Sequence, residues 1–195
     1  MKPLALITGV GPGTGASVAR RFAAAGYRTA LLARNEKRLN ALASELPDSK
    51  AIVCDVTDSE ALARAVEAAG PVDVVVHNAV GGGWGTFSEI EPEMLENNFQ
   101  VNVMALLHLA RLTTPSMVQA GKGALIVTGN TSALRGRAPF AGFAPTKAAQ
   151  RILAESMARE LGPKGVHIAY LVIDAVIDLA WTRQRFAGKS YDFFI

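Results

Sequence analysis

The chain has 195 residues, of which 50% are hydrophobic and 19% charged, so we expect one globular domain over residues 1–195. Its formal net charge is only +3, and no run of lysine and arginine indicates nucleic-acid binding. The apolar runs are too short for a membrane span or a signal-peptide core, and a single cysteine, Cys54, excludes an internal disulfide. We therefore expect a cytoplasmic protein without a membrane or nucleic-acid partner.

A glycine-rich stretch, Thr8 to Gly15, separates an apolar run from an amphipathic one. Residues 2–7 predict a strand, and residues 16–25 predict a helix with apolar residues on one face. This arrangement binds a dinucleotide, because glycines let the backbone approach the pyrophosphate and the helix offers free N–H groups. The alternative is a glycine-rich turn before an ordinary helix. The candidate cofactor-binding residues of the stretch are Thr8, Gly9, Gly11, Gly13 and Gly15.

The second predicted strand, residues 29–33, is followed by Arg34 where an acidic residue would indicate NAD. A guanidinium suits a ribose 2′-phosphate through its charge and its fork of N–H donors. The position favours NADP(H), with NAD(H) as the alternative cofactor and a solvated loop arginine as the alternative interpretation. Asn35 can cap the helix that follows, which is predicted to run through Leu39 and Leu42.

Residues 50–54 predict the third strand, and Asp58 can cap a helix that reaches residue 69. The valine-rich residues 72–76 predict a fourth strand that is buried on both faces. His77 should point away from Asn78 because side chains alternate along a strand, so we predict a packing role rather than a catalytic one. The glycines around Trp84 predict a mobile loop, in which the tryptophan either covers substrate or packs.

A long helix within residues 92–120 is apolar on nearly every side between Val101 and Leu112. Such a helix is buried all round, so one side can face the sheet and the other a second subunit. We therefore expect a homo-oligomer built on the helices 93–119 and 139–161. Asn102 lies inside this apolar segment despite its poor helix propensity, either as a tolerated polar residue or for a structural reason.

Residues 124–128 and 166–173 predict the fifth and sixth strands, with a helix within residues 139–161 between them. Pro145 is best tolerated in a first turn, so this helix is expected to start late. Six strands that alternate with helices predict an α/β fold. We expect a doubly wound parallel sheet of the Rossmann type with strand order 3-2-1-4-5-6.

Taken together, these motifs resemble the short-chain dehydrogenase/reductase family over residues 4 to about 181. The glycine stretch spells T-G-x-x-x-G-x-G, and further matches in order are Asp55-Val56, Asn78-Ala79, Asn102 and Lys147. The resemblance implies hydride transfer between a nicotinamide cofactor and a carbonyl or alcohol. It also implies that Asp55 accepts from the adenine amino group, although a helix cap is the alternative role for this residue.

The resemblance implies roles for the remaining matched residues. Asn78, followed by the matching Ala79, would help to hold the central strands together beside the cofactor. Asn102 would distort its helix and hold a water molecule for a proton relay. Lys147 would bind the nicotinamide ribose and lower the pKa of a neighbouring tyrosine.

This sequence departs from the family where the proton is handled. The family has a tyrosine four residues before the lysine and a serine thirteen residues before the tyrosine, whereas this chain has Phe143 and Asn130. Phe143 has no proton to give, but the Asn130 amide can donate to a carbonyl oxygen. A shift of two residues would use Ser132 instead, and the ungapped alignment favours Asn130. The position of the missing tyrosine is not taken by Tyr27, Tyr170 or Tyr191.

A third departure follows the sixth strand, where the family has Pro-Gly and a threonine that contact the nicotinamide. This chain has Asp174-Ala175 and Leu179, and the family's last helix and seventh strand have no counterpart, so we expect a shortened C-terminal part without periodicity from residue 182. The sequence predicts an NADP(H)-dependent oxidoreductase of a small-molecule substrate, with non-standard proton handling and no metal. The alternative is an inactive nucleotide-binding protein, either a sensor or a subunit.

Overall fold

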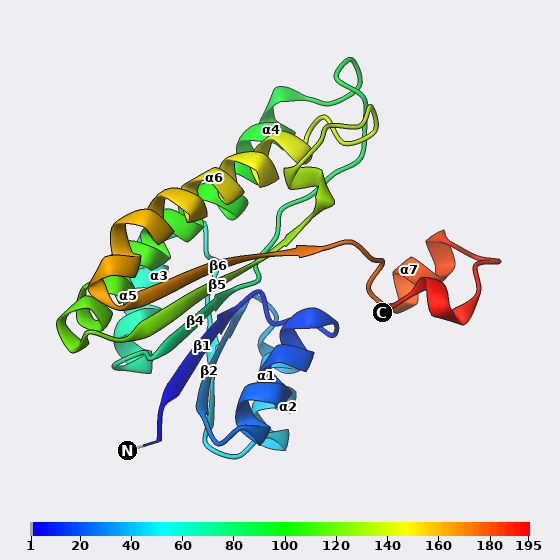
Figure 1. The fold of residues 1–195 in the computed structure, drawn as a ribbon. Helices are drawn as coiled ribbons and strands as arrows, with labels where there is room; N and C mark the ends of the chain where they lie inside the picture. Colours follow the sequence, from blue (N-terminus) through cyan, green and yellow to red (C-terminus); the bar gives the residue numbers. More distant parts are fainter. Residues whose placement is uncertain (1) are drawn as a thin grey trace.

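The computed structural model describes residues 2–195, which form a six-stranded parallel sheet (Figure 1). The strands are β1 (Leu4–Thr8), β2 (Arg28–Ala33), β3 (Ser49–Val53), β4 (Val74–His77), β5 (Gly123–Asn130) and β6 (Val166–Ile173). They lie in the order β3-β2-β1-β4-β5-β6, so β3 and β6 are the edge strands. The predicted doubly wound sheet and its strand order are confirmed.

Helices cover the sheet on both faces (Figure 1). On one face, α1 (Thr14–Ala24) and α2 (Glu36–Glu45) pack against β1, β2 and β3. The opposite face carries α3 (Ser59–Ala69), α4 (Pro92–Phe99), α5 (Ala105–Ala120) and α6 (Ala144–Leu161). The larger hydrophobic core lies under this second group, with Leu6, Leu106 and Leu125 fully buried. No helix in the described part of the chain has the length and apolar character needed to cross a membrane.

Three helices begin at the residues that the sequence predicts as their caps or first turns. The Asn35 side chain accepts a hydrogen bond from the Arg38 N–H group at 3.0 Å and caps α2. Asp58 accepts from two main-chain N–H groups and caps α3. Pro145 lies in the first turn of α6, so the predicted late start of this helix is confirmed.

The long helix predicted within residues 92–120 is divided into three parts. A π-helical turn over Gln100–Met104 joins α4 to α5, and Asn102 lies within this turn. Leu106 and Leu109 of α5 are fully buried, whereas Leu112 is 39% exposed. The apolar helix is therefore not covered on every side within one chain, and its predicted subunit contact stays a prediction.

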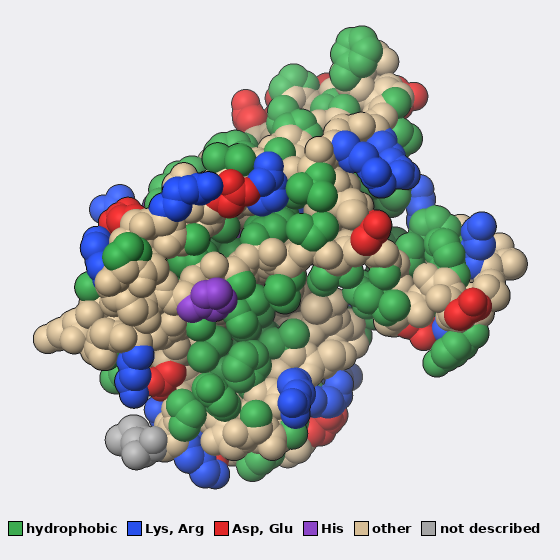
Figure 2. Space-filling model, in the orientation of Figure 1, with side chains coloured by type: hydrophobic (Ala, Val, Ile, Leu, Met, Phe, Trp, Pro, Cys, Tyr) green, Lys and Arg blue, Asp and Glu red, His purple; other side chains and the backbone are tan. Residues whose placement is uncertain are grey.

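The face that carries α1 and α2 is open over β5 and β6 in the described part of the chain. Val166 and Ile168 are buried on the opposite face, towards α5 and α6. By contrast, Leu171 is 47% exposed, and hydrophobic side chains are gathered on the surface between α6 and α1 (Figure 2). One half of the sheet is thus covered on both faces and the other half on one.

The tail from residue 182 shows no clear period in the sequence, but the segment after β6 contains short helical turns. A short helix, α7 (Ala180–Arg185), and a 3-10 turn at Tyr191–Phe193 project beyond the carboxyl end of β6 (Figure 1). The buried Thr182 hydroxyl accepts from the Leu179 N–H group and fixes the start of α7. A helix of less than two turns is too short to show an amphipathic period in the sequence.

Candidate active site

The glycine loop between β1 and α1 lies against the end of β4. Gly9 has a φ of +66°, and a Cβ atom there would lie 2.5 Å from the main chain of Ala79. A Cβ atom at Gly15 would lie 2.6 Å from the Gly9 carbonyl oxygen, so neither position accepts a side chain. At Gly11 no heavy atom lies within 4 Å of the Cβ position, so the loop is open there. A close main-chain approach with open space beside a helix N-terminus is the geometry that a pyrophosphate requires.

Hydrogen bonds tie the carboxyl ends of β1, β4 and β5 together. The Thr8 hydroxyl oxygen accepts from the N–H groups of Asn78 at 3.2 Å and Ala79 at 3.3 Å. The Asn78 amide donates to the Gly9 carbonyl at 2.8 Å, and its oxygen accepts from the Thr128 hydroxyl at 3.0 Å. These contacts place Thr8, Asn78 and Ala79 directly beside the glycine loop.

His77 is a buried residue at the end of β4, as its predicted packing role requires. Its Nδ1 atom lies 3.1 Å from the Thr8 hydroxyl oxygen, which already accepts two N–H groups and therefore donates its proton to the ring. Burial, and then the charge of Lys147, lower the pKa of His77 to about 3. The imidazole is therefore neutral at physiological pH.

Arg34 and Asp55 follow neighbouring strands, β2 and β3, and lie close together at the same edge of the sheet. The Arg34 Nη1 atom is 3.9 Å from Asp55 Oδ2, and the Arg34 side chain is 82% exposed and that of Asp55 45%. The other Asp55 oxygen accepts from the Thr57 N–H and hydroxyl groups, which lower the pKa of Asp55. An exposed ion pair of this length is weak, so both charged groups can turn to a ligand. Asp58 rather than Asp55 is the helix cap, and the adjacent Val56 is buried.

Lys147 lies on α6 and points into the protein interior, with 2% of its surface exposed. Its ammonium donates to the Thr128 carbonyl oxygen at 3.1 Å and to the side-chain oxygen of Gln150. Burial lowers the pKa of Lys147 to about 8. The lysine is therefore mostly charged at pH 7 and mostly neutral at pH 9.

Asn102 is fully buried in the π-helical turn and holds the Gly81 main chain. Its oxygen accepts from the Gly81 N–H group at 3.0 Å, and its amide donates to the Gly81 carbonyl at 2.9 Å. The same amide donates to the Thr146 hydroxyl of α6 at 2.8 Å. Asn102 is thus a structural residue and not a tolerated one, whereas its proposed water molecule stays a prediction.

Phe143 and Asn130 lie at the mouth of the site. Phe143 precedes the first residue of α6, one turn before Lys147, and its ring approaches the Cβ position of Gly82. Asn130 ends β5, and its side-chain oxygen accepts from the Ser132 N–H group at 3.1 Å. In residues 2–195 no acceptor engages the Asn130 amide hydrogens, which are therefore available to a ligand.

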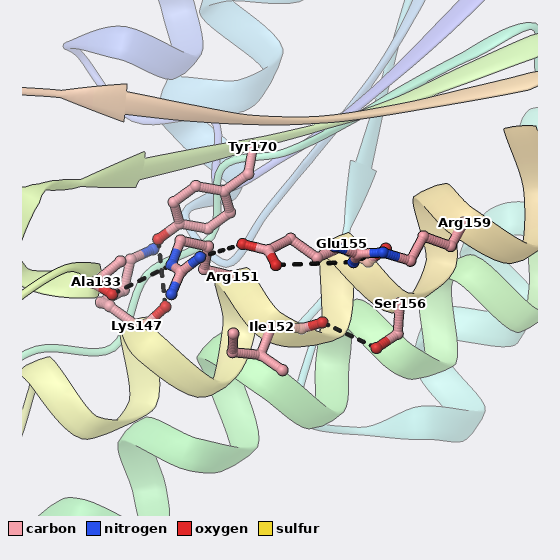
Figure 3. A network of polar contacts seen from close by, with 8 residues as sticks. All are labelled: Ala133, Lys147, Arg151, Ile152, Glu155, Ser156, Arg159 and Tyr170. Carbon is pink, nitrogen blue, oxygen red and sulfur yellow. Dashed lines mark hydrogen bonds and ion pairs between the residues drawn. The ribbon is translucent and has the colours of Figure 1, made fainter.

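Tyr170 of β6 lies against α6 at Lys147, as Figure 3 shows. Its hydroxyl donates to the main-chain oxygen of Lys147 at 3.4 Å, and its ring centroid is 5.9 Å from the ammonium. Burial raises the pKa of Tyr170 to about 12. The phenol therefore faces the main chain and is a poor acid, in agreement with the sequence interpretation that it does not replace the missing tyrosine.

A cavity lies directly beside Asn130. It is lined by Thr131, Ser132, Arg135, Arg137, Phe140 and Asp174. Trp84 is half exposed above Phe140, with 4.5 Å between the ring centroids, and the Arg185 guanidinium of α7 lies 4.2 Å over the Trp84 ring. Trp84 therefore packs on neighbouring side chains and also stands near the cavity.

The segment after β6 reaches back to the glycine loop. The side chains of Ile177 and Leu179 lie 3.2 and 3.0 Å from the Cβ position of Gly13. Asp174 accepts a hydrogen bond from the Thr131 hydroxyl at 3.2 Å. Residues 174–179 thus contact the candidate site both at Thr131, beside the cavity, and at Gly13, in the glycine loop.

The family model described as short chain dehydrogenase matches residues 3–180, which is most of the chain. The chain belongs to the short chain dehydrogenase family. It is therefore an NAD(P)-dependent oxidoreductase by family, as the sequence predicted.

Named relatives agree with this assignment. A D-erythrulose reductase of Gallus gallus is 33% identical over 165 residues, which are 84% of this chain and 67% of that protein. An L-xylulose reductase of Bos taurus is 32% identical over 193 residues, which are 96% of this chain and 79% of that protein. The NADPH-bound structure of a short chain oxidoreductase from Pseudomonas aeruginosa PAO1, described as containing an atypical catalytic center, has a TM-score of 0.87 at 27% identity. That match covers 94% of this chain and 75% of the other.

Sequence reasoning about this short chain dehydrogenase missed three polar residues around Lys147: Gln150, Thr146 and Thr128. Gln150 follows Lys147 by three residues, so the helical period alone places both side chains on one face. A glutamine among the apolar residues of α6 was a usable signal. The contact through the Thr128 carbonyl left no signal, because any residue supplies a main-chain oxygen.

Proposed function

We propose that this short chain dehydrogenase is an NADP(H)-dependent oxidoreductase that handles the substrate proton without a tyrosine. The observation that carries this proposal is the buried ammonium of Lys147 beside the Asn102 turn, at the same edge of the sheet as the open glycine loop. The NADPH-bound structure described as having an atypical catalytic center supports it. We also propose that residues 1–195 act as one cytoplasmic domain in a homo-oligomer, with no membrane or nucleic-acid partner.

The residues at the glycine loop fit a dinucleotide phosphate. Gly9 and Gly15 bring the main chain close, Gly11 leaves open space, and Gly13 directly precedes α1. Arg34 would hold the ribose 2′-phosphate of NADP(H), and Asp55 would accept from the adenine amino group. When bound, the cofactor supplies or accepts the hydride, while Lys147 is placed to contact its ribose.

The polar groups near Asn130 fit a carbonyl oxygen. A carbonyl that gains a hydride develops negative charge on oxygen, and donors placed in advance stabilise that charge. The Asn130 amide supplies a neutral donor. Lys147, whose ammonium donates to the Thr128 carbonyl on the same strand, supplies positive charge. A small substrate would lie in the cavity lined by Ser132 and Phe140, and Phe143 stands next to Phe140 with 6.5 Å between the ring centroids.

Cofactor preference is tested on Arg34. We expect NADPH to bind more tightly than NADH, and Arg34→Ala to weaken NADPH by about 10- to 100-fold, as expected for a lost charge-assisted hydrogen bond. Fluorescence titration of both cofactors measures this. Arg159→Ala on the outer side of α6 is the matched control. Equal affinity for both cofactors, or an unchanged NADPH affinity in Arg34→Ala, would contradict the preference.

An inactive nucleotide-binding protein is the second candidate, favoured by one observation. Phe143 stands one turn before Lys147, where the family has its tyrosine, and it has no proton to give. The two candidates differ in turnover. Purified protein that oxidises NADPH with a member of a broad panel of small carbonyls is an enzyme, whereas protein that binds NADPH and turns over none of them is a sensor or a subunit.

A further inference from the structure

Gln150 connects two groups of the candidate site that do not touch each other. Its amide nitrogen donates to the Asn102 main-chain oxygen at 2.6 Å, and its side-chain oxygen accepts from the Lys147 ammonium. Gln150 and Asn102 are fully buried, and Lys147 is 2% exposed. The bridge therefore runs from the π-helical turn to the lysine without contact with solvent.

Only one orientation of the Gln150 amide is compatible with these neighbours. In the orientation present, the NH₂ group faces a carbonyl oxygen and the oxygen faces an ammonium. A flipped amide would place NH₂ against the ammonium and oxygen against the Asn102 carbonyl, and both contacts would be repulsive. The π-helical turn therefore orients Gln150 as an acceptor for Lys147.

The ammonium depends on this acceptor because it has no counter-ion. In residues 2–195 no carboxylate forms an ion pair with Lys147, and the second acceptor is the Thr128 carbonyl. The titratable side chains that face it are His77 from β4 and Tyr170 from β6, and both are neutral near pH 7. Arg151 lies further along α6 and pairs with Glu155. A buried charge without a partner is unstable, so each neutral acceptor matters.

We propose that Gln150 is a positioning residue, which fixes the Lys147 ammonium to the main chain of the π-helical turn and keeps it charged. This role goes beyond the proposed function, because Gln150 itself touches neither cofactor nor substrate. It also gives the Asn102 turn a second task besides holding Gly81. A substitution at Gln150 should therefore shift the pH at which Lys147 loses its proton.

The test measures the titration of the Lys147 amine directly. The protein is labelled with ε-¹³C-lysine, Lys147→Met identifies the Lys147 signal, and its titration is recorded by NMR between pH 6 and 11 without cofactor. In Gln150→Leu the charged amine loses an acceptor, so the titration midpoint falls by about one pH unit or more. In Gln150→Glu the acceptor carries a negative charge, and the midpoint rises. Gln119→Leu, an exposed position on α5, leaves the midpoint unchanged.

An unchanged midpoint in Gln150→Leu would overturn the proposal, as would a fall in Gln150→Glu. If Gln150→Leu does not fold, Gln150→Glu decides alone. NADPH titrations of the same variants separate this proposal from the function of the chain. If the NADPH affinity of each variant declines with rising pH at the Lys147 midpoint of that variant, the result supports both the role of Gln150 and Lys147 as a cofactor contact. A shifted midpoint with pH-independent NADPH binding supports the role of Gln150 and contradicts Lys147 as a cofactor contact.

Discussion

Phe143, directly before α6, and Lys147, one turn later, differ in what they offer a substrate. Lys147 is charged and buried, and its hydrogen bonds go to Thr128 and Gln150. Phe143 is half-buried one turn earlier and presents a ring without a transferable proton. A positive charge in the interior stabilises a nearby oxyanion electrostatically even where it does not donate directly. At the scale of single residues, the candidate site thus combines a buried positive charge with a ring that has no proton to give.

Restoring the acid should raise activity. We expect Phe143→Tyr combined with Asn130→Ser to increase NADPH-dependent reduction of simple carbonyls by about 10²- to 10⁴-fold, the usual contribution of a general acid. The phenol would stand directly before α6, one turn from Lys147. Initial rates of NADPH oxidation with a panel of small aldehydes and ketones measure the effect.

Lys147→Ala in the parent is the companion experiment, and it should remove whatever activity the parent has. A double variant that folds and binds NADPH but stays inert would show that the acid was not the missing part. Residues 174–179, which contact both the cavity and Gly13, would then be the cause, and the inactive nucleotide-binding protein would gain support.

At the scale of elements, the π-helical turn joins α4 to α5 and is held by one asparagine. Asn102→Ala removes three hydrogen bonds and leaves the partly buried N–H and carbonyl groups of Gly81 without their partner, while the Thr146 hydroxyl keeps its bond to the Phe143 carbonyl. We expect the free energy of unfolding to fall by about 2–4 kcal/mol. Urea denaturation followed by circular dichroism measures it. Asn97→Ala on the exposed side of α4 is the control and should be neutral or slightly stabilising, since alanine favours helix.

The elements themselves were largely predictable from the sequence. Periodicity and caps such as Asn35 and Asp58 identified the strands and helices, and their alternation indicated the strand order. The π-helical turn was implied only through the family, because one asparagine in an apolar run does not say which main-chain groups it binds. The Gln150 bridge depends on contacts between α6 and the π-helical turn, which local patterns do not encode. The contact of Leu179 with Gly13 is equally remote in sequence.

At the scale of the whole molecule, two exposed apolar side chains lie on the helices for which we propose a subunit contact. Leu112 of α5 is 39% exposed and Ile152 of α6 is 50% exposed, on the helices predicted for the interface. We expect a homo-oligomer at micromolar concentration and dissociation in Ile152→Arg, because a charge would be buried without a partner. Sedimentation velocity measures both. Phe87→Arg, on the exposed loop before α4, should leave assembly intact, and a monomeric parent would contradict the interface.

The outer edge of β6 affects how copies of the chain associate with one another. Val166–Ile173 is an eight-residue edge strand without proline or lysine, and the sheet beside it is open on one face. Proteins usually protect such edges with charges, prolines or a covering element, since unpaired N–H and C=O groups template the addition of another strand. In the described part of the chain none of these protects β6. The strand that packs Tyr170 against Lys147 is therefore also the place where one sheet can continue into the next, and where a concentrated sample would begin to polymerise.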